Sequence, residues 1–208
     1  SSSAASDVYK RQEEEVREYA LCMKDPVYFI EKYAKIISLD KGLVPFNLYP
    51  YQKEMFEHFD KNRFSIVLAC RQSGKSISSV VYILWYAIFN PEKTVAILAN
   101  KGATAREMLA RIQIALENLP FFLQPGCKAL NKGSIEFSNN SKILAAATSG
   151  SSIRGLSINL LFLDEFAFID DDARFYTSTY PVVSAGKDTQ IIICSTANGI
   201  GNVYHKPV

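Results

Sequence analysis

The sequence has few of the residues that build metal centres or covalent cross-links. Its cysteines are widely separated, with no CxxC or Cys/His spacing; they are Cys22, Cys70, Cys127 and Cys194. This pattern argues against a zinc site and a disulfide framework, and it favours a reducing compartment. The two histidines, His58 and His205, are isolated in the sequence, so we assign neither a metal-binding nor a catalytic role.

The sequence also lacks long hydrophobic runs and a strong excess of charge. The most apolar segment, 80–89, is far shorter than the roughly 20 residues that span a bilayer, and no signal pattern precedes the domain. We therefore expect a buried helix there and no membrane partner. The net charge of +2 provides no global attraction to nucleic acid, so any DNA contact must be local.

Length and composition predict one globular domain. A chain of 208 residues with 48% hydrophobic side chains can bury a substantial core. We expect residues 1–15 to be a disordered or artefactual tail, because residues 1–6 are only serine and alanine and a charged run follows. Residues 16–45 are predicted to form a helical prelude, in which one helix begins at Pro26 with Asp25 as its cap.

From residue 46 onward, predicted helices and strands alternate. Continuous apolar strands separated by helices are typical of a parallel sheet covered on both faces. The sequence therefore predicts an α/β fold with a mostly parallel sheet flanked by helices. The predicted helices span 51–59, 75–89 and 105–119, and the predicted strands span 64–69, 94–99, 134–137, 142–147, 160–164 and 190–195.

A phosphate-binding loop follows the first of these strands. Residues 69–76 read Ala-Cys-Arg-Gln-Ser-Gly-Lys-Ser and fit the pattern except at Ala69, where glycine is usual. In such a loop, backbone N–H groups surround the phosphates, Lys75 reaches the β and γ phosphates, and Ser76 ligates Mg²⁺. The dipole of the following helix strengthens the anion site. Together with Gly74, these residues predict nucleotide binding.

Two adjacent acids, Asp164 and Glu165, end the apolar strand 160–164. The carboxyl ends of parallel strands are where open α/β sheets bind ligands. We expect Asp164 to hold Mg²⁺ opposite Ser76, and Glu165 to orient the water that attacks the γ-phosphate. The chain between Lys75 and Asp164 leaves room for an intervening strand. Taken alone, such an acid pair is more often a helix cap; the phosphate loop upstream reverses that preference.

Four further candidates each have an ordinary alternative. Ser195 and Thr196, at the end of an apolar strand, could sense loss of the γ-phosphate, or they could simply open a turn. Gln52 could read adenine beside a stacking aromatic, or it could be an exposed residue at a helix start. Arg71 could stabilise γ-phosphate charge as an arginine finger in cis, or pair with an acid. Arg154 precedes the acidic strand and could contact phosphate, or belong to a surface loop.

Several motifs, in this order along the chain, resemble the large terminase subunit of tailed bacteriophages, the motor that packages DNA into the procapsid. In that family the phosphate loop typically carries an arginine and tolerates loss of the first glycine, which Arg71 and Ala69 resemble. The resemblance runs from about Asp25 to Val203 and rests on residues 25–30, 48–52, 71–76, 99–105, 153–155, 163–169 and 195–199.

The resemblance implies a P-loop NTPase of the RecA-like, additional-strand type over residues 46–208, with ATP and Mg²⁺ as cofactors. It also implies a role for each candidate residue. The implied roles are adenine reading by Gln52; phosphate binding by Arg71, Gln72, Ser73, Gly74, Lys75 and Ser76; magnesium binding by Ser76 and Asp164; catalysis by Glu165 as base with Lys75 and Arg71; and coupling of hydrolysis to DNA movement by Ser195 and Thr196.

The same resemblance implies double-stranded DNA, a portal protein and a small terminase subunit as partners. It further implies assembly into a homo-oligomeric ring, and a location in the host cytoplasm with transient attachment at the procapsid portal. Members of the family normally continue into a nuclease domain of ribonuclease H type. Because no acidic metal cluster follows the coupling motif before Val208, we expect a C-terminally truncated chain without nuclease activity.

Two other functions fit the motifs. One is a fragment of a superfamily-2 helicase, which shares the glutamine motif, the Asp-Glu strand end and the Ser-Thr strand end. Those enzymes need a second motor domain, and 208 residues accommodate only one. The other is an interaction module that binds ATP without hydrolysing it. Measuring ATP hydrolysis with and without DNA separates these functions.

Overall fold

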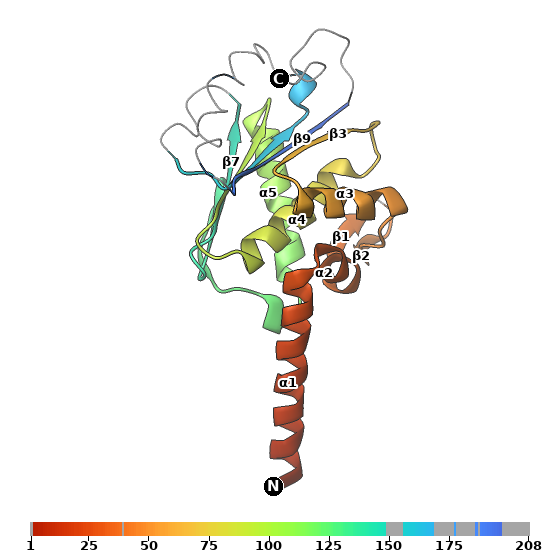
Figure 1. Cartoon of the computed structure of the whole chain (residues 1–208), viewed down its shortest axis with the longest axis vertical. Coiled ribbons are helices and arrows are strands. Elements are labelled where there is room, and N and C mark those ends of the chain that lie inside the picture. Colours follow the sequence, from red (N-terminus) through yellow and green to blue (C-terminus); the bar gives the residue numbers. More distant parts are fainter. Residues whose placement is uncertain are drawn as a thin grey trace.

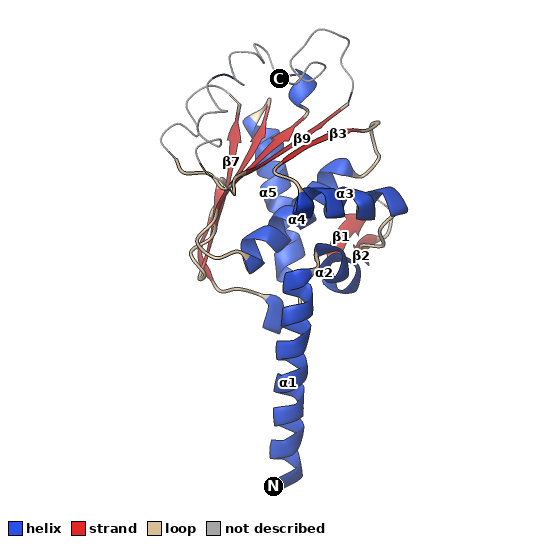
Figure 2. Ribbon diagram, viewed as in Figure 1, coloured by secondary structure: helices blue, strands red, loops and turns tan. Residues whose placement is uncertain are grey.

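The computed structural model describes residues 2–38, 40–148, 156–168, 177, 186 and 188–196, with side chains from residue 7 onward. A seven-stranded sheet carries helices against one face, and a long N-terminal helix projects away from this body (Figure 1). Colouring by secondary structure separates the strands of the sheet from the helices beside it (Figure 2). None of the helices in the described part of the chain is long and apolar enough to cross a membrane.

The sheet is mostly parallel, which confirms the predicted α/β class. Its strand order is β3-β9-β8-β4-β7-β6-β5. The pairs from β3 to β7 are parallel, whereas β6 and β5 continue the sheet in antiparallel fashion. The strands are β3 (Phe64–Leu68), β4 (Thr94–Ala99), β5 (Cys127–Leu130), β6 (Ser134–Phe137), β7 (Lys142–Ala147), β8 (Leu160–Asp164) and β9 (Gln190–Ser195).

Strand β9 lies between β3 and β8, so one strand does intervene between the phosphate loop and the acidic strand. This inserted strand is the additional strand of the predicted RecA-like type. The register pairs Leu68 with Ser195 on one side of β9, and Asp164 with Cys194 on the other. The parallel strands therefore end level with one another, which gathers their following residues at one edge of the sheet.

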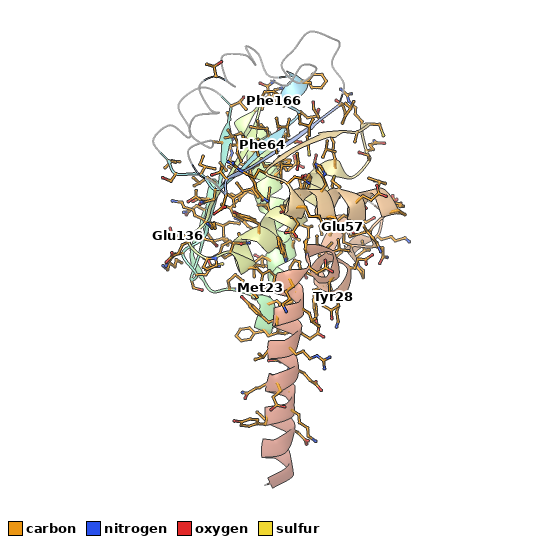
Figure 3. All side chains as sticks on the ribbon, in the orientation of Figure 1. Met23, Tyr28, Glu57, Phe64, Glu136 and Phe166 are labelled. Carbon is orange, nitrogen blue, oxygen red and sulfur yellow. The ribbon has the colours of Figure 1, made fainter. Side chains whose placement is uncertain are left out.

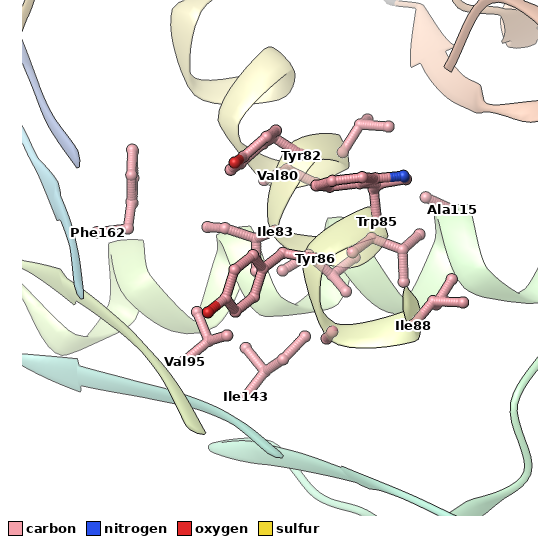
Figure 4. Packing of buried hydrophobic residues seen from close by; sticks show 14 of the residues in the cluster. Val80, Tyr82, Ile83, Trp85, Tyr86, Ile88, Val95, Ala115, Ile143 and Phe162 are labelled. Atoms are coloured by element: carbon pink, nitrogen blue, oxygen red, sulfur yellow. The ribbon is translucent and has the colours of Figure 1, made fainter. Parts of the chain in front are cut away.

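Helix α4 (Lys75–Phe89) is the centre of the core, since all of its residues except Ser76 and Ile77 are buried. A helix that is apolar on every side is one that is covered on every side. Figure 4 shows Ile83 and Tyr86 directed toward Val95 and Ile143 of the sheet, with Trp85 on the opposite side of the helix. Helices α5 (Gly102–Glu117) and α3 (Pro50–Lys61) pack beside α4.

The opposite face of the sheet carries a second, smaller apolar cluster. Alternation along the strands gives each face its own set of side chains, and the second set is Ala96, Leu98, Ile158, Leu161, Leu163, Phe166, Ile191 and Ile193. At the edge of this face, Phe64, Ile66 and Leu68 of β3 remain between 43% and 65% exposed. The sheet is therefore less well covered at β3 than at its centre.

The N-terminal segment differs from the prediction. One helix, α1 (Ser2–Lys24), includes the residues expected to be a disordered tail. Its alanine, glutamate, arginine and lysine content favours a helix even without packing partners. Most described side chains of α1 before Met23 project into solvent (Figure 3). Near its end α1 meets the body, where the Trp85 indole donates to the carbonyl of Cys22 at 2.8 Å.

The predicted helical prelude is helical only in part. Helix α2 (Pro26–Tyr33) begins as predicted, with the Asp25 carboxylate accepting from two backbone N–H groups of its first turn. The chain then forms an antiparallel hairpin of β1 (Lys35–Ser38) and β2 (Gly42–Pro45). Consecutive β-branched residues in β1 favour a strand, and Gly42 adopts a φ of 68° near the turn. Two short 3₁₀ segments, η1 (Phe121–Leu123) and η2 (Phe166–Phe168), complete the described elements.

Candidate nucleotide-binding site

The phosphate loop connects β3 to α4 with two residues in left-handed backbone conformation. Gly74 has φ 79° and caps α4, and Gln72 has φ 61°. These turns direct the loop around the N-terminus of α4, where unpaired N–H groups and the helix dipole favour an anion. The Ser73 hydroxyl is buried and has no hydrogen-bond partner among the described residues. A phosphate oxygen would fit both the N–H groups and this hydroxyl.

The structure brings the predicted loop and acid residues together. The ammonium group of Lys75 lies 3.1 Å from Oε1 of Glu165, and the lysine side chain is only 7% exposed. The Ser76 hydroxyl lies 3.4 Å from Oδ1 of Asp164. A serine hydroxyl beside a carboxylate provides two oxygen ligands, which suits Mg²⁺ because this ion takes few protein ligands when phosphates complete its shell.

The carboxylate of Glu165 is held from two sides. Its Oε1 faces Lys75, while its Oε2 accepts hydrogen bonds from the backbone N–H of Thr196 at 3.2 Å and the hydroxyl of Thr196 at 3.1 Å. Burial opposes ionisation of Glu165, but hydrogen bonds from Lys75 and Thr196 outweigh it and lower the pKa. Glu165 also has a φ of 50°, an uncommon conformation for a residue other than glycine that is enriched at functional sites.

Asp164 has the opposite electrostatic response. Burial and the neighbouring charge of Glu165 raise the pKa of Asp164 to about 6, although Lys75 and Ser76 act in the other direction. Two adjacent carboxylates thus differ in their tendency to ionise. A divalent cation placed between Asp164 and Ser76 would favour the ionised form of Asp164 and so lower its pKa again.

Two cavities adjoin the phosphate loop. One, of about 420 Å³, lies along α3 and the edge strand β3 and reaches Ser73 and Lys75. The other, of about 300 Å³, contains Arg71 together with both acids, and the start of α5 forms its far wall. The loop therefore separates a space beside α3 from a space beside the acids. Arg71 is exposed in the second space, where a γ-phosphate next to Glu165 would be within the same cavity.

Gln52 is buried, which excludes the alternative of an exposed residue at a helix start. It is 2% exposed, and its amide bonds to the backbone N–H of Tyr49 and to the hydroxyl of Ser78. The neighbouring Tyr51 hydroxyl donates to the carbonyl of Ser73 in the phosphate loop. The sequence did not indicate Ser78, because a serine within an apolar helix gives no signal until the packing of α3 on α4 is known.

The remaining candidates are only partly described. Ser195 and Thr196 lie at the end of β9 against Glu165, and the Ser195 hydroxyl accepts from the backbone N–H of Ala167 at 3.1 Å. Arg154 and residues 197–199 fall outside the described residues. Sequence reasoning missed the polar side chains that line the cavity opposite the acids, which are Asn100, Lys101 and Thr104. They belong to the segment 99–105 that contributes to the family resemblance, but the sequence assigned them no role at the site, and only the fold places them opposite the acids.

The fold and site together define a P-loop nucleotide-binding domain of the RecA-like type. The sequence profile of the N-terminal part of terminase large subunits of the T4-like virus type matches residues 66–205. The chain therefore belongs to the terminase large-subunit family.

Solved structures of phage terminases share this fold. The HK97 bacteriophage large terminase superposes with a TM-score of 0.68 at 18% identity, over 83% of this chain and 37% of that chain. The large terminase ATPase domain of Thermus phage P74-26 gives 0.61 at 19% identity, over 75% and 67% of the two chains. The large terminase of a thermophilic bacteriophage in complex with ADP gives 0.56 at 15% identity, over 72% and 39%. This chain thus spans little more than a third of the HK97 protein.

Proposed function

We propose that this chain is the ATP-hydrolysing motor domain of a viral terminase large subunit, which drives DNA into the procapsid. The observation that carries the proposal is the contact of Lys75 with Glu165, at 3.1 Å, beside the Ser76 and Asp164 pair. If the two acids only capped a helix, a contact between one of them and the lysine of the phosphate loop would not be expected. The ADP bound by the terminase of the thermophilic bacteriophage supports nucleotide binding within the family.

Binding of ATP would use the loop and the first turn of α4. The backbone N–H groups of residues 72–76, the Ser73 hydroxyl and Lys75 would bind the β and γ phosphates. Ser76 and Asp164 would hold Mg²⁺, which neutralises phosphate charge when bound. On ATP binding, Lys75 would exchange the Glu165 carboxylate for phosphate oxygens. This exchange frees Oε1 of Glu165.

Hydrolysis would then use the freed carboxylate. Glu165 orients a water molecule and accepts its proton as the water oxygen bonds to the γ-phosphorus and the bond to the β-phosphate oxygen breaks. Arg71, in the same cavity, would stabilise the negative charge of the transferring phosphoryl group. In this proposal the arginine finger is Arg71, a residue of the phosphate loop of the same chain.

The same carboxylate would connect chemistry to movement. Oε2 of Glu165 accepts hydrogen bonds from Thr196, which follows the end of β9. A displacement of Glu165 during turnover would therefore shift Ser195 and Thr196. We assign these two residues the coupling role. Double-stranded DNA, a portal protein, a small terminase subunit and further copies of the chain in a ring are the partners that we propose from family membership.

The substitution Glu165→Gln tests the proposal. It keeps the shape of the side chain but removes the proton acceptor, so we expect ATP turnover to fall by about 100-fold or more while nucleotide binding persists. The measurement is steady-state phosphate release, with and without DNA, alongside binding of a fluorescent ATP analogue.

Glu107→Gln is the matched control, because Glu107 is a surface glutamate that pairs with Arg111 away from the loop. It should leave turnover unchanged. Comparable hydrolysis by parent and Glu165→Gln proteins would exclude the proposed catalytic role. Nucleotide binding by a parent protein that never hydrolyses ATP, even with DNA, would favour the nucleotide-gated interaction module.

A further inference from the structure

The residue proposed as catalytic base lies in a turn and not within a strand. Strand β8 ends at Asp164, and Glu165 leads directly into the 3₁₀ turn η2. The backbone of Glu165 is left-handed, with a φ of 50°. Such a conformation in a residue other than glycine persists only where the surrounding contacts hold it. The contacts of η2 therefore decide where the Glu165 carboxylate points.

The inner part of η2 is held by the core and by β9. Phe166 is fully buried on the second face of the sheet, and the backbone N–H of Ala167 donates to the Ser195 hydroxyl at 3.1 Å. The backbone N–H of Phe168 donates to the carbonyl of Glu165 at 3.0 Å, which closes the turn. The carbonyl of Phe168 then lies at the outer end of η2.

The side chain of Asn100 holds this outer end. Its Nδ2 donates to the carbonyl of Phe168 at 3.2 Å. Asn100 directly follows β4, whose last residue, Ala99, pairs with Asp164 in the parallel register. The register therefore places Asn100 level with Glu165, at the edge of the sheet where the ligand site lies. Both partners of the hydrogen bond line the cavity of about 300 Å³ that contains Glu165.

This hydrogen bond is separate from the machinery that binds phosphate. In the described part of the chain, the Asn100 amide forms no hydrogen bond with the phosphate loop or with either carboxylate, and its partner is the carbonyl of Phe168. Phe168 is bonded in turn to the carbonyl of Glu165. Asn100 is thus connected to Glu165 through the backbone of η2.

We propose that Asn100 is a positioning residue for the catalytic base. Its amide fastens the outer end of η2 and so keeps the Glu165 carboxylate directed toward Lys75 and the phosphate loop. The inference rests on the proposed function, because it requires Glu165 to act as the base. Its consequence is that Asn100 governs the rate of hydrolysis and leaves the affinity for nucleotide unchanged.

The test is a double-mutant cycle between Asn100 and Glu165. Single-turnover hydrolysis of Mg·ATP and the affinity for a non-hydrolysable ATP analogue are measured for the parent, Asn100→Ala, Glu165→Gln and the double variant. We expect Asn100→Ala to slow hydrolysis by about fivefold or more, the equivalent of one hydrogen bond, with unchanged affinity. In the Glu165→Gln background the same substitution should slow hydrolysis no further, because no base remains to be positioned.

Gln113→Ala is the matched control. Gln113 also donates from its side-chain amide to a backbone carbonyl, that of Asn131, at 3.3 Å. It lies in the second half of α5, whereas the start of that helix borders the cavity. Its substitution removes the same kind of hydrogen bond elsewhere in the fold, so it should change neither the rate of hydrolysis nor the affinity.

Each outcome supports or overturns the positioning role. Equal rates in the parent and Asn100→Ala would overturn it, and so would an equal loss of rate in both backgrounds, which is the result of a merely structural role. A loss of analogue affinity would assign Asn100 to nucleotide binding and overturn it too. If Asn100→Ala does not fold, Asn100→Leu removes the donor with little change in size and gives the same comparison.

Failure of the proposed function has a different signature. Hydrolysis by Glu165→Gln at the rate of the parent would contradict the role of Glu165 itself, whatever the result for Asn100. A slow Glu165→Gln variant beside an Asn100→Ala variant as fast as the parent would overturn only the positioning role.

Discussion

At the scale of single residues, the site contains a carboxylate that the fold makes unfavourable to ionise. Asp164 is 4% exposed, and burial together with Glu165 raises its pKa to about 6. Lys75 and Ser76 offset only part of this effect. A buried charge retained at the expense of stability is a common property of sites that bind a cation. The charge of Asp164 therefore lowers folding stability while it serves cation binding, and a substitution that removes the charge should affect the two in opposite directions.

We predict that Asp164→Asn stabilises the ligand-free protein and removes magnesium-dependent turnover. In the parent, the folded state keeps the Asp164 proton up to about pH 6, whereas the unfolded chain releases it near pH 4. Between these pH values the unfolded state binds fewer protons, so the free energy of unfolding falls as pH rises. The asparagine side chain of the variant does not ionise, so its free energy of unfolding does not fall in this way. We expect the free energy of unfolding of Asp164→Asn to exceed that of the parent by on the order of 1–2 kcal/mol at pH 7.5.

Denaturant unfolding of both proteins between pH 4 and pH 8 checks this prediction. The difference in the free energy of unfolding should be small near pH 4 and reach its full value above pH 6. A difference that is constant with pH would show that the substitution acts through something other than the Asp164 charge.

At the scale of elements, a surface cluster fastens the projecting helix α1 to α2. The Glu18 carboxylate accepts from Lys32 at 2.8 Å, from Tyr33 at 2.7 Å and from Tyr28 at 2.9 Å. Hydrogen bonds from Lys32 and Tyr33 lower the pKa of Glu18 to about 2. Several donors on one carboxylate form a network, which makes a surface ion pair more effective than it is alone.

We predict that Glu18→Gln loosens α1 and lowers the melting temperature by a few degrees at pH 7. Because the pKa of Glu18 is lower in the folded protein than in the unfolded chain, its stabilisation is complete above about pH 4.5 and is lost as pH falls toward 2. Amide hydrogen exchange in residues 7–24 should become faster in the variant at pH 7. Glu15→Gln, which affects an exposed pair with Arg11, is the control and should change little.

At the scale of the whole molecule, nucleotide binding should be visible as global stabilisation. The P-loop joins β3 to the central helix α4, and the acids end β8, so a ligand bound to both connects the main layers of the fold. A ligand that binds only the folded state adds about 2.7 kcal/mol at 100 times its dissociation constant. For a domain of this size that corresponds to about 5–10 °C in melting temperature.

We therefore predict that Mg·ATP raises the melting temperature of the parent chain but not of Lys75→Ala. The variant lacks the ammonium group that would bind the β and γ phosphates, and Lys61→Ala serves as control because Lys61 is exposed on α3. Differential scanning fluorimetry with increasing Mg·ATP measures the shift. An equal shift in Lys75→Ala and the parent would indicate that ATP binds somewhere other than the phosphate loop.

The sequence by itself determined the mostly parallel sheet and the phosphate loop. Both depend on local patterns: runs such as 160–163 are apolar on both faces of the strand, and the loop at 69–76 has the residue types that phosphate binding requires. The helix start at Pro26 was predictable for the same reason, since Asp25 caps it through neighbouring backbone groups. Each of these features depends on residues close together in the chain.

Only the tertiary structure decided what depends on distant partners. The hairpin at 35–45 replaced the last part of the predicted helical prelude, and α1 included the segment 1–15 that was expected to be a tail. Short segments such as these are compatible with more than one secondary structure, and tertiary context selects between them. The contact of Lys75 with Glu165 requires β9, from much later in the chain, to lie between β3 and β8. Gln52 was recognisable as a motif, but the direction of its amide was fixed by the packing of α3 on α4, which no local pattern encodes.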